Sequence, residues 1–165
     1  MNRRRTLLLA AAPLALAGCG FALRKAPNFS FHSIYLALPT GAGLGLELRR
    51  QLEGAGQIEL ITDAARKDKA DVVLESAGEQ RERIVVSRTA TGLVSEVQLR
   101  VRFAFSVRTP AGRELLPRAE ILRQIDQSYS ESAALSKEQE ALMLYQNMQS
   151  DIVQQVMRRL ATVKL

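Results

Sequence analysis

Hydrophobic and polar residues alternate most regularly between residues 97 and 108, where every second side chain is apolar. A period of two is typical of a β-strand that has one face on a core and the other in water. The pattern therefore predicts a strand over residues 97–107. Its apolar positions are Val97, Leu99, Val101, Phe103, Phe105 and Val107, and its polar face includes Arg100, Arg102 and Arg108.

Three other segments have the composition of strands. Residues 33–39 end at a proline, and residues 71–86 are long enough for one bent strand or two short ones. Residues 113–127 follow a Thr-Pro-Ala-Gly turn, which predicts a hairpin. Pro117 in this segment indicates a bulge or an edge position, because proline cannot donate a backbone hydrogen bond. The remaining pieces are a short extended segment at 58–62, a charged connection at 63–70 and a polar turn at 87–92.

Two segments carry the spacing of amphipathic helices. Leucines recur at every fourth position from residue 44 to residue 52, which predicts a short helix over about residues 44–54. Ser136 and Gln139 form a capping-box pattern, which predicts a second helix from Ser136 to about residue 161. The apolar face of this helix is expected at Ala141, Tyr145, Met148, Ile152, Val156 and Leu160.

The order strand, helix, three strands, helix predicts an α+β two-layer sandwich. We expect a mixed, mostly antiparallel sheet of about four strands, with both helices packed on one face. The face that carries Arg100, Arg102 and Arg108 would then be uncovered. A charged open face is common on antiparallel sheets, so two interpretations remain: an ordinary solvated face, or a surface that meets an anionic or polar partner.

The N-terminus has the pattern of an export signal. Arg3, Arg4 and Arg5 precede an uncharged apolar run that ends at Gly18, too short for the roughly 20 residues of a membrane-spanning helix. Leu16-Ala-Gly-Cys19 fits a bacterial lipobox, which predicts removal of residues 1–18 and lipidation of Cys19. An ordinary cleavage site with an incidental cysteine, or a buried free cysteine, are the alternatives.

Residues beyond Cys19 suggest where the chain is held and how it is organised. Gly20 stands where an aspartate would retain a lipoprotein at the inner membrane, so the outer membrane, on its periplasmic side, is predicted. Residues 19–31 contain few periodic apolar positions and are interpreted as a lipidated tether. Residues 32–165 are expected to form one domain.

Composition excludes several classes of function. Removing the three signal arginines lowers the formal net charge from +6 to +3, and no basic block remains, so a nucleic-acid partner is not expected. A single histidine, His32, and no second cysteine argue against a His/Cys metal site. We find no catalytic constellation and expect neither enzymatic activity nor a cofactor. The scattered carboxylates Glu75, Glu79, Glu82 and Glu96 are interpreted as salt-bridge candidates.

Three glycines lie close together between the first predicted strand and the first predicted helix. Gly41-Ala-Gly43-Leu-Gly45 lies where a dinucleotide-binding fingerprint would lie. Leu46 occupies the position where that motif needs glycine or alanine for close packing of helix on strand. The cluster is therefore interpreted as a flexible start of the helix.

Several motifs together resemble the LptE family of lipopolysaccharide-assembly lipoproteins. They occur in the family's order along essentially the whole chain, although this chain ends at Leu165, where some members continue in a longer polar tail. The matching segments are GCGFALR (18–24), VVSRTATG (85–92) followed by EVQL (96–99), ILRQIDQSY (121–129), ALSKE (134–138) and LYQNMQSD (144–151).

The resemblance implies a function and a partner. Members of the family plug the lumen of the β-barrel protein LptD in the outer membrane, and the two proteins deliver lipopolysaccharide to the outer leaflet. The family is also reported to bind lipopolysaccharide. Arg88 and Lys137 match basic positions of the family pattern and are the candidate contacts to lipid A phosphates. The alternative is an accessory lipoprotein of an envelope transporter that binds a lipid without entering a barrel.

Overall fold

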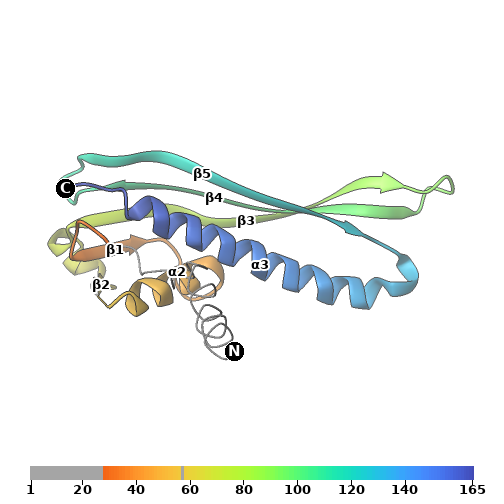
Figure 1. The fold of residues 1–165 in the computed structure, drawn as a ribbon, viewed down its shortest axis with the longest axis horizontal. Coiled ribbons are helices and arrows are strands. Elements are labelled where there is room, and N and C mark those ends of the chain that lie inside the picture. Colours follow the sequence, from red (N-terminus) through yellow and green to blue (C-terminus); the bar gives the residue numbers. More distant parts are fainter. Residues whose placement is uncertain (1–27, 57) are drawn as a thin grey trace, which may run out of the picture.

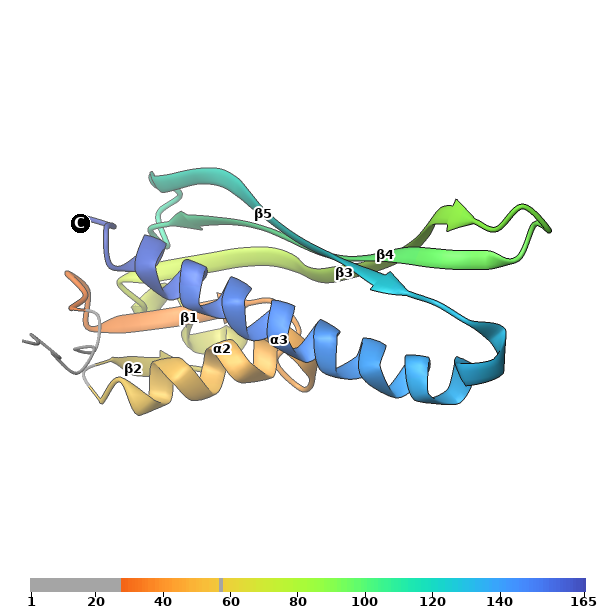
Figure 2. The ribbon, with the colours of Figure 1, turned by 45° about the vertical axis from the view of Figure 1, so that its right-hand side comes forward.

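The computed structural model describes residues 28–56 and 58–165. The predicted signal peptide, Cys19 and Gly20 lie outside the described residues. The described chain forms two layers, a five-stranded sheet and two helices on one of its faces (Figures 1 and 2). The predicted α+β sandwich with both helices on one side is therefore confirmed.

The sheet has the strand order β2-β1-β3-β4-β5. Strand β1 pairs in parallel with both β2 and β3, whereas β3–β4 and β4–β5 are antiparallel hairpins. The expected count of four strands is one too low, because the short extended piece at 58–62 pairs with β1 and becomes the edge strand β2. The strands are β1 (Ser33–Ala37), β2 (Glu59–Ile61), β3 (Val72–Arg88), β4 (Val94–Arg108) and β5 (Glu114–Ser128).

The helices are α2 (Gly43–Gly54) and α3 (Ala134–Leu160), and both lie close to their predicted ranges. The capping box predicted at Ser136 is wrong. A 3-10 turn at Glu131–Ala133 leads directly into α3, so the chain is already helical before Ser136. The Ser136 hydroxyl instead donates to the Ala133 carbonyl at 2.8 Å. The charged connection forms a second 3-10 helix, Ala64–Lys69.

Strand β4 carries the centre of the core. Its predicted apolar positions are all buried, and the residues between them are partly exposed, so the period-two pattern is confirmed. Helix α3 buries the face that its sequence predicted, with Tyr145 only partly buried. Pro117 lies in the edge strand β5, where the pairing with β4 shifts register between Phe105 and Val107. Both meanings predicted for this proline are therefore realised.

Strand β3 is one long strand of 17 residues with a bulge, not two short strands. Its pairing with β4 shifts between Ser76 and Glu79, and Gly78 has φ +99°, a conformation that glycine adopts without strain. The extra residue reverses the alternation, so that Glu79 and Arg81 lie opposite buried β4 residues and face the helices. The bulge thereby moves charged side chains to the helical side of the sheet.

The folded part begins earlier than the predicted boundary at residue 32. Phe31 is 1% exposed and belongs to the core, and its ring lies 5.3 Å from that of Phe29. The Ser30 hydroxyl donates to the Val163 carbonyl at 2.6 Å. The last residues assigned to the tether are therefore held in the domain. His32, the only histidine, is exposed, and its backbone N–H donates to Asp71.

Two of the three glycines in the cluster, Gly43 and Gly45, are needed for close packing, which corrects the interpretation of the cluster as a flexible helix start. A Cβ on Gly45 would lie 1.9 Å from the Pro39 carbonyl oxygen. Gly43 has φ +58° and abuts the carboxylate of Glu79, which accepts the Leu44 N–H at 3.2 Å. Glu79 therefore supplies the N-terminal cap that α2 lacks within its own sequence.

Candidate functional site

The sheet and α3 extend well beyond α2, β1 and β2 toward one end of the molecule (Figure 1). We call this the distal end: the turn at residues 89–93, the adjoining strand ends and the first turns of α3. Both basic residues singled out by the family pattern lie here. The opposite end, where α2, β1, β2 and the C-terminal half of α3 meet, is called the core end.

Arg88 is the last residue of β3 and borders the turn of the distal hairpin. Its side chain is exposed, and one guanidinium nitrogen donates to the Gly92 carbonyl at 3.0 Å. Two backbone hydrogen bonds close the turn, from the Thr89 N–H to Leu93 at 2.8 Å and from the Gly92 N–H to Thr89 at 2.9 Å. Most of the donors of Arg88 are thus left for a ligand, on a turn with a defined backbone.

Lys137 lies in the first turn of α3, as predicted, but its ammonium group is already engaged. Its Nζ donates to the Ser128 hydroxyl at 3.1 Å and to the Glu140 carboxylate at 2.8 Å, and the side chain is 21% exposed. The hydrogen bond from Lys137 lowers the pKa of the Glu140 carboxyl. An anionic ligand at Lys137 must therefore share this cation with Glu140.

The sheet places both cations at the same end of the molecule. Ser87, Glu96 and Ser128 face one another across β3, β4 and β5, so they form one row. Arg88 follows the first residue of that row, and Lys137 bonds to the last. With strands about 4.8 Å apart, the backbones of Ser87 and Ser128 are about 10 Å apart. Residues 49 positions apart in the sequence thus lie next to the two ends of one backbone row.

Polar contacts hold α3 against the sheet at the distal end. Arg83 forms an ion pair with Glu138 and lies over the Tyr129 ring, 5.1 Å from its centroid. Glu138 therefore compensates Arg83, and the carboxylate that compensates Lys137 is Glu140. The Tyr145 hydroxyl donates to the Glu82 carbonyl at 2.8 Å, and burial raises the pKa of this tyrosine.

The three arginines of β4 lie together on the face of the sheet opposite the helices, which we call the open face. Arg108 forms an ion pair with Glu75, and Arg102 lies 3.8 Å from Glu120. Arg100 donates from Nε to Gln98 at 2.6 Å. The open face is thus a mixed polar surface in which two of the three arginines already have carboxylate partners.

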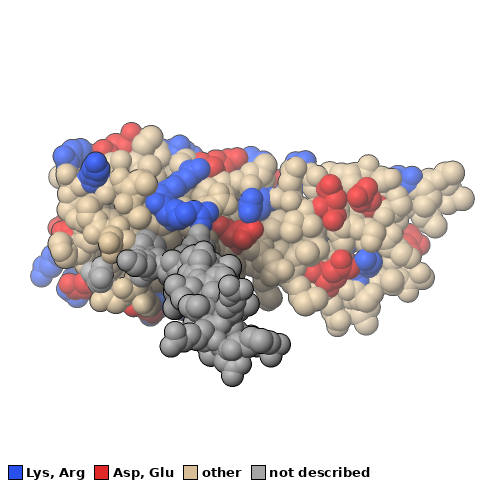
Figure 3. All heavy atoms as spheres, viewed as in Figure 1, with Lys and Arg blue, Asp and Glu red and all other residues tan. Residues whose placement is uncertain are grey.

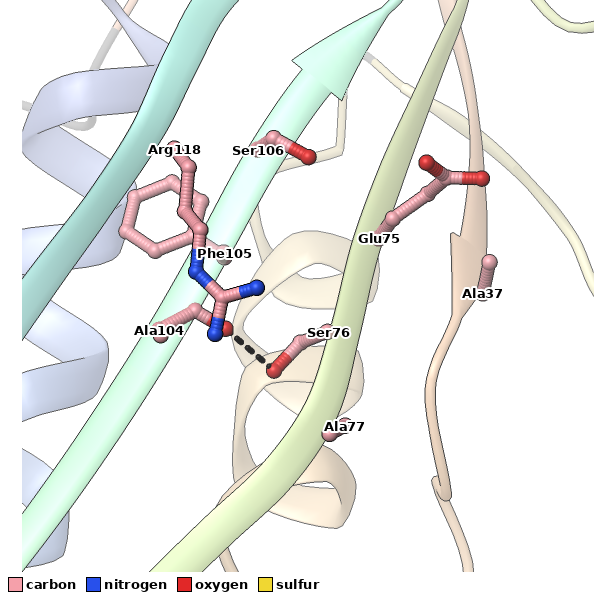
Figure 4. A pocket seen from close by; sticks show the side chains of 8 residues that line it. All are labelled: Ala37, Glu75, Ser76, Ala77, Ala104, Phe105, Ser106 and Arg118. Carbon is pink, nitrogen blue, oxygen red and sulfur yellow. Dashed lines mark hydrogen bonds between the residues drawn. The ribbon is translucent and has the colours of Figure 1, made fainter.

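A fourth arginine on the open face was not predicted from any pattern in the sequence. Arg118 in β5 borders a hollow of about 290 Å³, with Glu75 on its other side (Figure 4). A second hollow of about 190 Å³ adjoins it and shares Arg118, Ala77 and Ala104. Only the three-dimensional register of β3, β4 and β5 brings these residues together.

Charge is distributed in patches of both signs on the surface. In Figure 3 acidic and basic side chains are interspersed, and the largest basic group on that face lies away from the distal end. In the part of the chain that the structure describes, no three His, Cys, Asp or Glu side chains are grouped to hold a metal ion. Nor is any helix of that part long and apolar enough to cross a membrane.

Solved structures define the class of protein to which this fold belongs. The solution structure of uncharacterized lipoprotein B from Nitrosomonas europaea matches with a TM-score of 0.72 at 26% identity, over 86% of this chain and 90% of that chain. The crystal structure of rare lipoprotein B from Shewanella oneidensis shares the fold, with a TM-score of 0.66 at 24% identity, over 79% and 95% of the two chains. The domain is thus of a kind found in bacterial lipoproteins.

Sequence comparison identifies the family. The model of the LptE family, described as lipopolysaccharide-assembly, matches residues 31–160. The LPS-assembly lipoproteins LptE of Yersinia pestis (strain Pestoides F) and Yersinia pseudotuberculosis (serotype O:1b) are each 31% identical over 167 residues, 98% of this chain and 77% of theirs. The chain belongs to the LptE family, whose role is lipopolysaccharide assembly, and the predicted family membership is confirmed.

Proposed function

We propose that this chain is an outer-membrane lipoprotein that plugs the lumen of the β-barrel protein LptD and contacts lipopolysaccharide through its distal end. Cys19 carries the lipid anchor, on the periplasmic side. Membership of the LptE family supports the assembly role. The single observation that supports the ligand site is that Arg88 follows Ser87 and Lys137 bonds to Ser128, the two outer residues of one row of the sheet.

The surface of the domain suits the interior of a barrel. The lumen of a transmembrane barrel is polar, so a plug must present polar and charged faces to it. The open face does so with Arg100, Arg102 and Arg108, two of them paired with carboxylates. Because two of these arginines are already neutralised by carboxylates of the same domain, little uncompensated charge would be buried when the barrel surrounds the open face.

The chemistry of the distal end suits a phosphorylated ligand. Lipid A carries phosphates, and a guanidinium binds phosphate through two parallel hydrogen bonds, whereas an ammonium acts as a point charge. Arg88 is exposed and has donors to spare. Lys137 already donates two of its three N–H groups, to Ser128 and Glu140, so Arg88 is expected to contribute more of the affinity.

The partner is tested by purification from the native membrane. The full-length lipidated chain, tagged at its C-terminus, is isolated in mild detergent, and the proteins that accompany it are identified by mass spectrometry. We expect LptD in stoichiometric amount, and an unrelated tagged lipoprotein serves as control. Purification of the lipidated chain without a barrel protein would contradict the plug and favour the accessory-lipoprotein alternative.

The ligand site is tested with charge variants at the two ends of the sheet. We expect Arg88→Glu to weaken binding of purified lipopolysaccharide several-fold, and Lys137→Gln less. Arg113→Glu, in the exposed turn at the opposite end of β4, is the matched control and should bind as the parent chain does. Equal binding by all three variants would remove Arg88 and Lys137 from the site.

The anchor has its own test, because it does not depend on the partner. Labelled palmitate supplied to cells should be incorporated into the parent chain. When the membranes are separated by density, the labelled chain should be found in the outer-membrane fraction. A Cys19→Ser variant should take up no label. Label that persists in this variant would contradict lipidation at Cys19.

A further inference from the structure

Two bulges in the sheet create the hollow on the open face. One is at Gly78 in β3, and the other is beside Pro117 in β5, where the pairing with β4 also shifts. The lining between them includes small side chains, so the sheet surface is depressed there. The lining residues are Ala37, Glu75, Ser76, Ala77, Ala104, Phe105, Ser106 and Arg118.

Polar groups at the floor of the hollow are hydrogen-bonded to one another. The Ser76 hydroxyl donates to the Ala104 carbonyl at 2.7 Å and accepts the Gly78 N–H at 3.0 Å. These bonds fix the bulge of β3 to β4 without help from any ligand. The hollow is therefore a preformed feature of the sheet.

Arg118 is the uncompensated charge at this site. Figure 4 shows its side chain extending across β4 toward Ser76 and Ala104, with no hydrogen bond to the other lining residues. No ion pair joins Arg118 to any residue that the structure describes, whereas the neighbouring carboxylates Glu75 and Glu120 face Arg108 and Arg102. The guanidinium of Arg118 therefore lies over the hollow without a partner among the described residues.

We propose that this hollow is a docking socket for a single Asp or Glu side chain on the lumen wall of the partner barrel, which Arg118 binds through two parallel hydrogen bonds. The inference rests on the proposed function, since it needs a barrel protein around the open face. A carboxylate matches the planar guanidinium fork. At about 290 Å³ the hollow lies just below the range of about 300–1,000 Å³ typical of small-molecule sites, and suits an inserted side chain.

The charges around the socket favour a carboxylate over a lipopolysaccharide phosphate. Glu75 lines the larger hollow and Glu120 the smaller one, and each has an arginine partner, Arg108 and Arg102. Arg118 therefore adds one unbalanced positive charge, and a phosphate carrying up to two negative charges would exceed it. One carboxylate brings one negative charge, which Arg118 balances. The socket also lies on a different part of the molecule from Arg88 and Lys137.

Salt-dependent co-purification tests the proposal with Arg118→Glu. Arg113→Glu is the matched control, because it reverses an exposed arginine at the nearby β4–β5 turn that does not line the hollow. Loss of a charge-assisted hydrogen-bonded pair should weaken retention of the barrel protein about tenfold at low salt, and the difference from the parent chain should shrink as salt is raised. The control should retain it as the parent chain does, and circular dichroism should show the same melting temperature for both variants.

A photo-crosslinking residue at position 118, with position 113 for comparison, identifies what occupies the socket. We expect a crosslink from position 118 to a barrel peptide that contains Asp or Glu, and changing that residue to Arg should restore retention of the Arg118→Glu chain. Crosslinking to lipopolysaccharide, or parent-like retention by Arg118→Glu, would overturn the socket alone. Failure of the parent chain to retain a barrel protein would overturn the proposed function and the socket with it.

Discussion

The two ends of the molecule are held together by different interactions. At the core end, α2 and the C-terminal half of α3 bury aliphatic side chains against the sheet, and Leu48, Val72 and Leu160 are fully buried. At the distal end the apolar core narrows to residues such as Val97 and Ala141, and ion pairs, cation–π contacts and single hydrogen bonds, such as those of Arg83 and Tyr145, are added to it. The sheet and helix α3 run without interruption from the core end to the distal end.

This difference separates stability from recognition. Burial of apolar surface is the dominant favourable term in folding, so the core end carries most of the free energy of unfolding. Exposed ion pairs contribute little, and the distal end can therefore exchange its internal contacts for contacts to a ligand at small cost. Lys137, shared between Ser128 and Glu140, is the clearest case.

The largest effect is expected from truncating a leucine at the core end. Leu48→Ala leaves a cavity at a side chain that is 0% exposed and should lower the free energy of unfolding by about 2 to 5 kcal/mol. Leu135→Ala makes the same chemical change at the distal end, where the leucine is 77% exposed, and should change stability by less than about 0.5 kcal/mol. Denaturant unfolding measures both, and equal losses would contradict the comparison.

The second effect tests how α2 is seated. Gly45→Ala places a Cβ 1.9 Å from the Pro39 carbonyl oxygen and should destabilise the chain by about 1 to 3 kcal/mol. Gly54→Ala, at the other end of the same helix, meets nothing within 4 Å and should be neutral or stabilise by up to about 1 kcal/mol. If thermal unfolding gave both variants the same sign, close packing would not explain the glycine cluster.

The third effect depends on pH. The backbone N–H groups of His32 and Ser33 donate to Asp71 at 2.7 and 3.0 Å and lower the pKa of its carboxyl below the unfolded value. The stabilisation is therefore present above about pH 4 and is lost as pH falls through the folded pKa. After allowance for partial exposure, Asp71→Asn should lose about 1 kcal/mol at pH 7.

Acid titration of stability provides the check on Asp71. Because asparagine does not ionise, the difference between the parent chain and Asp71→Asn should shrink as pH falls below about 4. A Glu59→Gln variant, in which an exposed ion pair with Arg66 is removed from the same region, is the control and should change stability far less at pH 7. If the difference in stability between the parent chain and Asp71→Asn grew toward low pH, the pKa of Asp71 would not be lowered by folding.

The smallest effect is expected from removing the polar contacts of Arg83 with Glu138 and Tyr129 at the distal end. Arg83→Ala removes the ion pair with Glu138 and the contact over Tyr129, and should cost about 0.5 to 1 kcal/mol because both charged groups are partly exposed. Hydrogen exchange should become faster in the first turns of α3 and unchanged in α2. A loss as large as that of Leu48→Ala would mean that the distal end is not held loosely.

The layers of the fold were predictable because its main elements carry long periodic signals. Alternation over β4 and the leucine spacing of α2 both report burial directly, and both were confirmed. Strand β2 was not counted because three residues are too few to show a period. The start of α3 was misplaced because a preceding 3-10 turn overrides a capping pattern that is only local.

The residues of the candidate site were proposed from the sequence, whereas their arrangement comes from the structure. Arg88 and Lys137 came from the resemblance to the family, and no local pattern says that β3, β4 and β5 place them on one row. The glycine cluster looked like flexibility, since the contact between Gly45 and Pro39 appears only after the strand and helix have packed. Arg118 could not be predicted as a site residue from the sequence. It lies between two bulges, and the carboxylates near it are already paired with other arginines.

The two turns at the ends of β4 provide the most direct test of the account. Both are closed by the same pair of backbone bonds and by a glycine with positive φ, so a photo-crosslinking residue at Thr91 and one at Ala111 differ mainly in location. In cells that are exporting lipopolysaccharide, the account predicts crosslinks to lipopolysaccharide from position 91 and none from position 111. Equal labelling from both turns, or labelling from position 111 alone, would contradict recognition at the distal end.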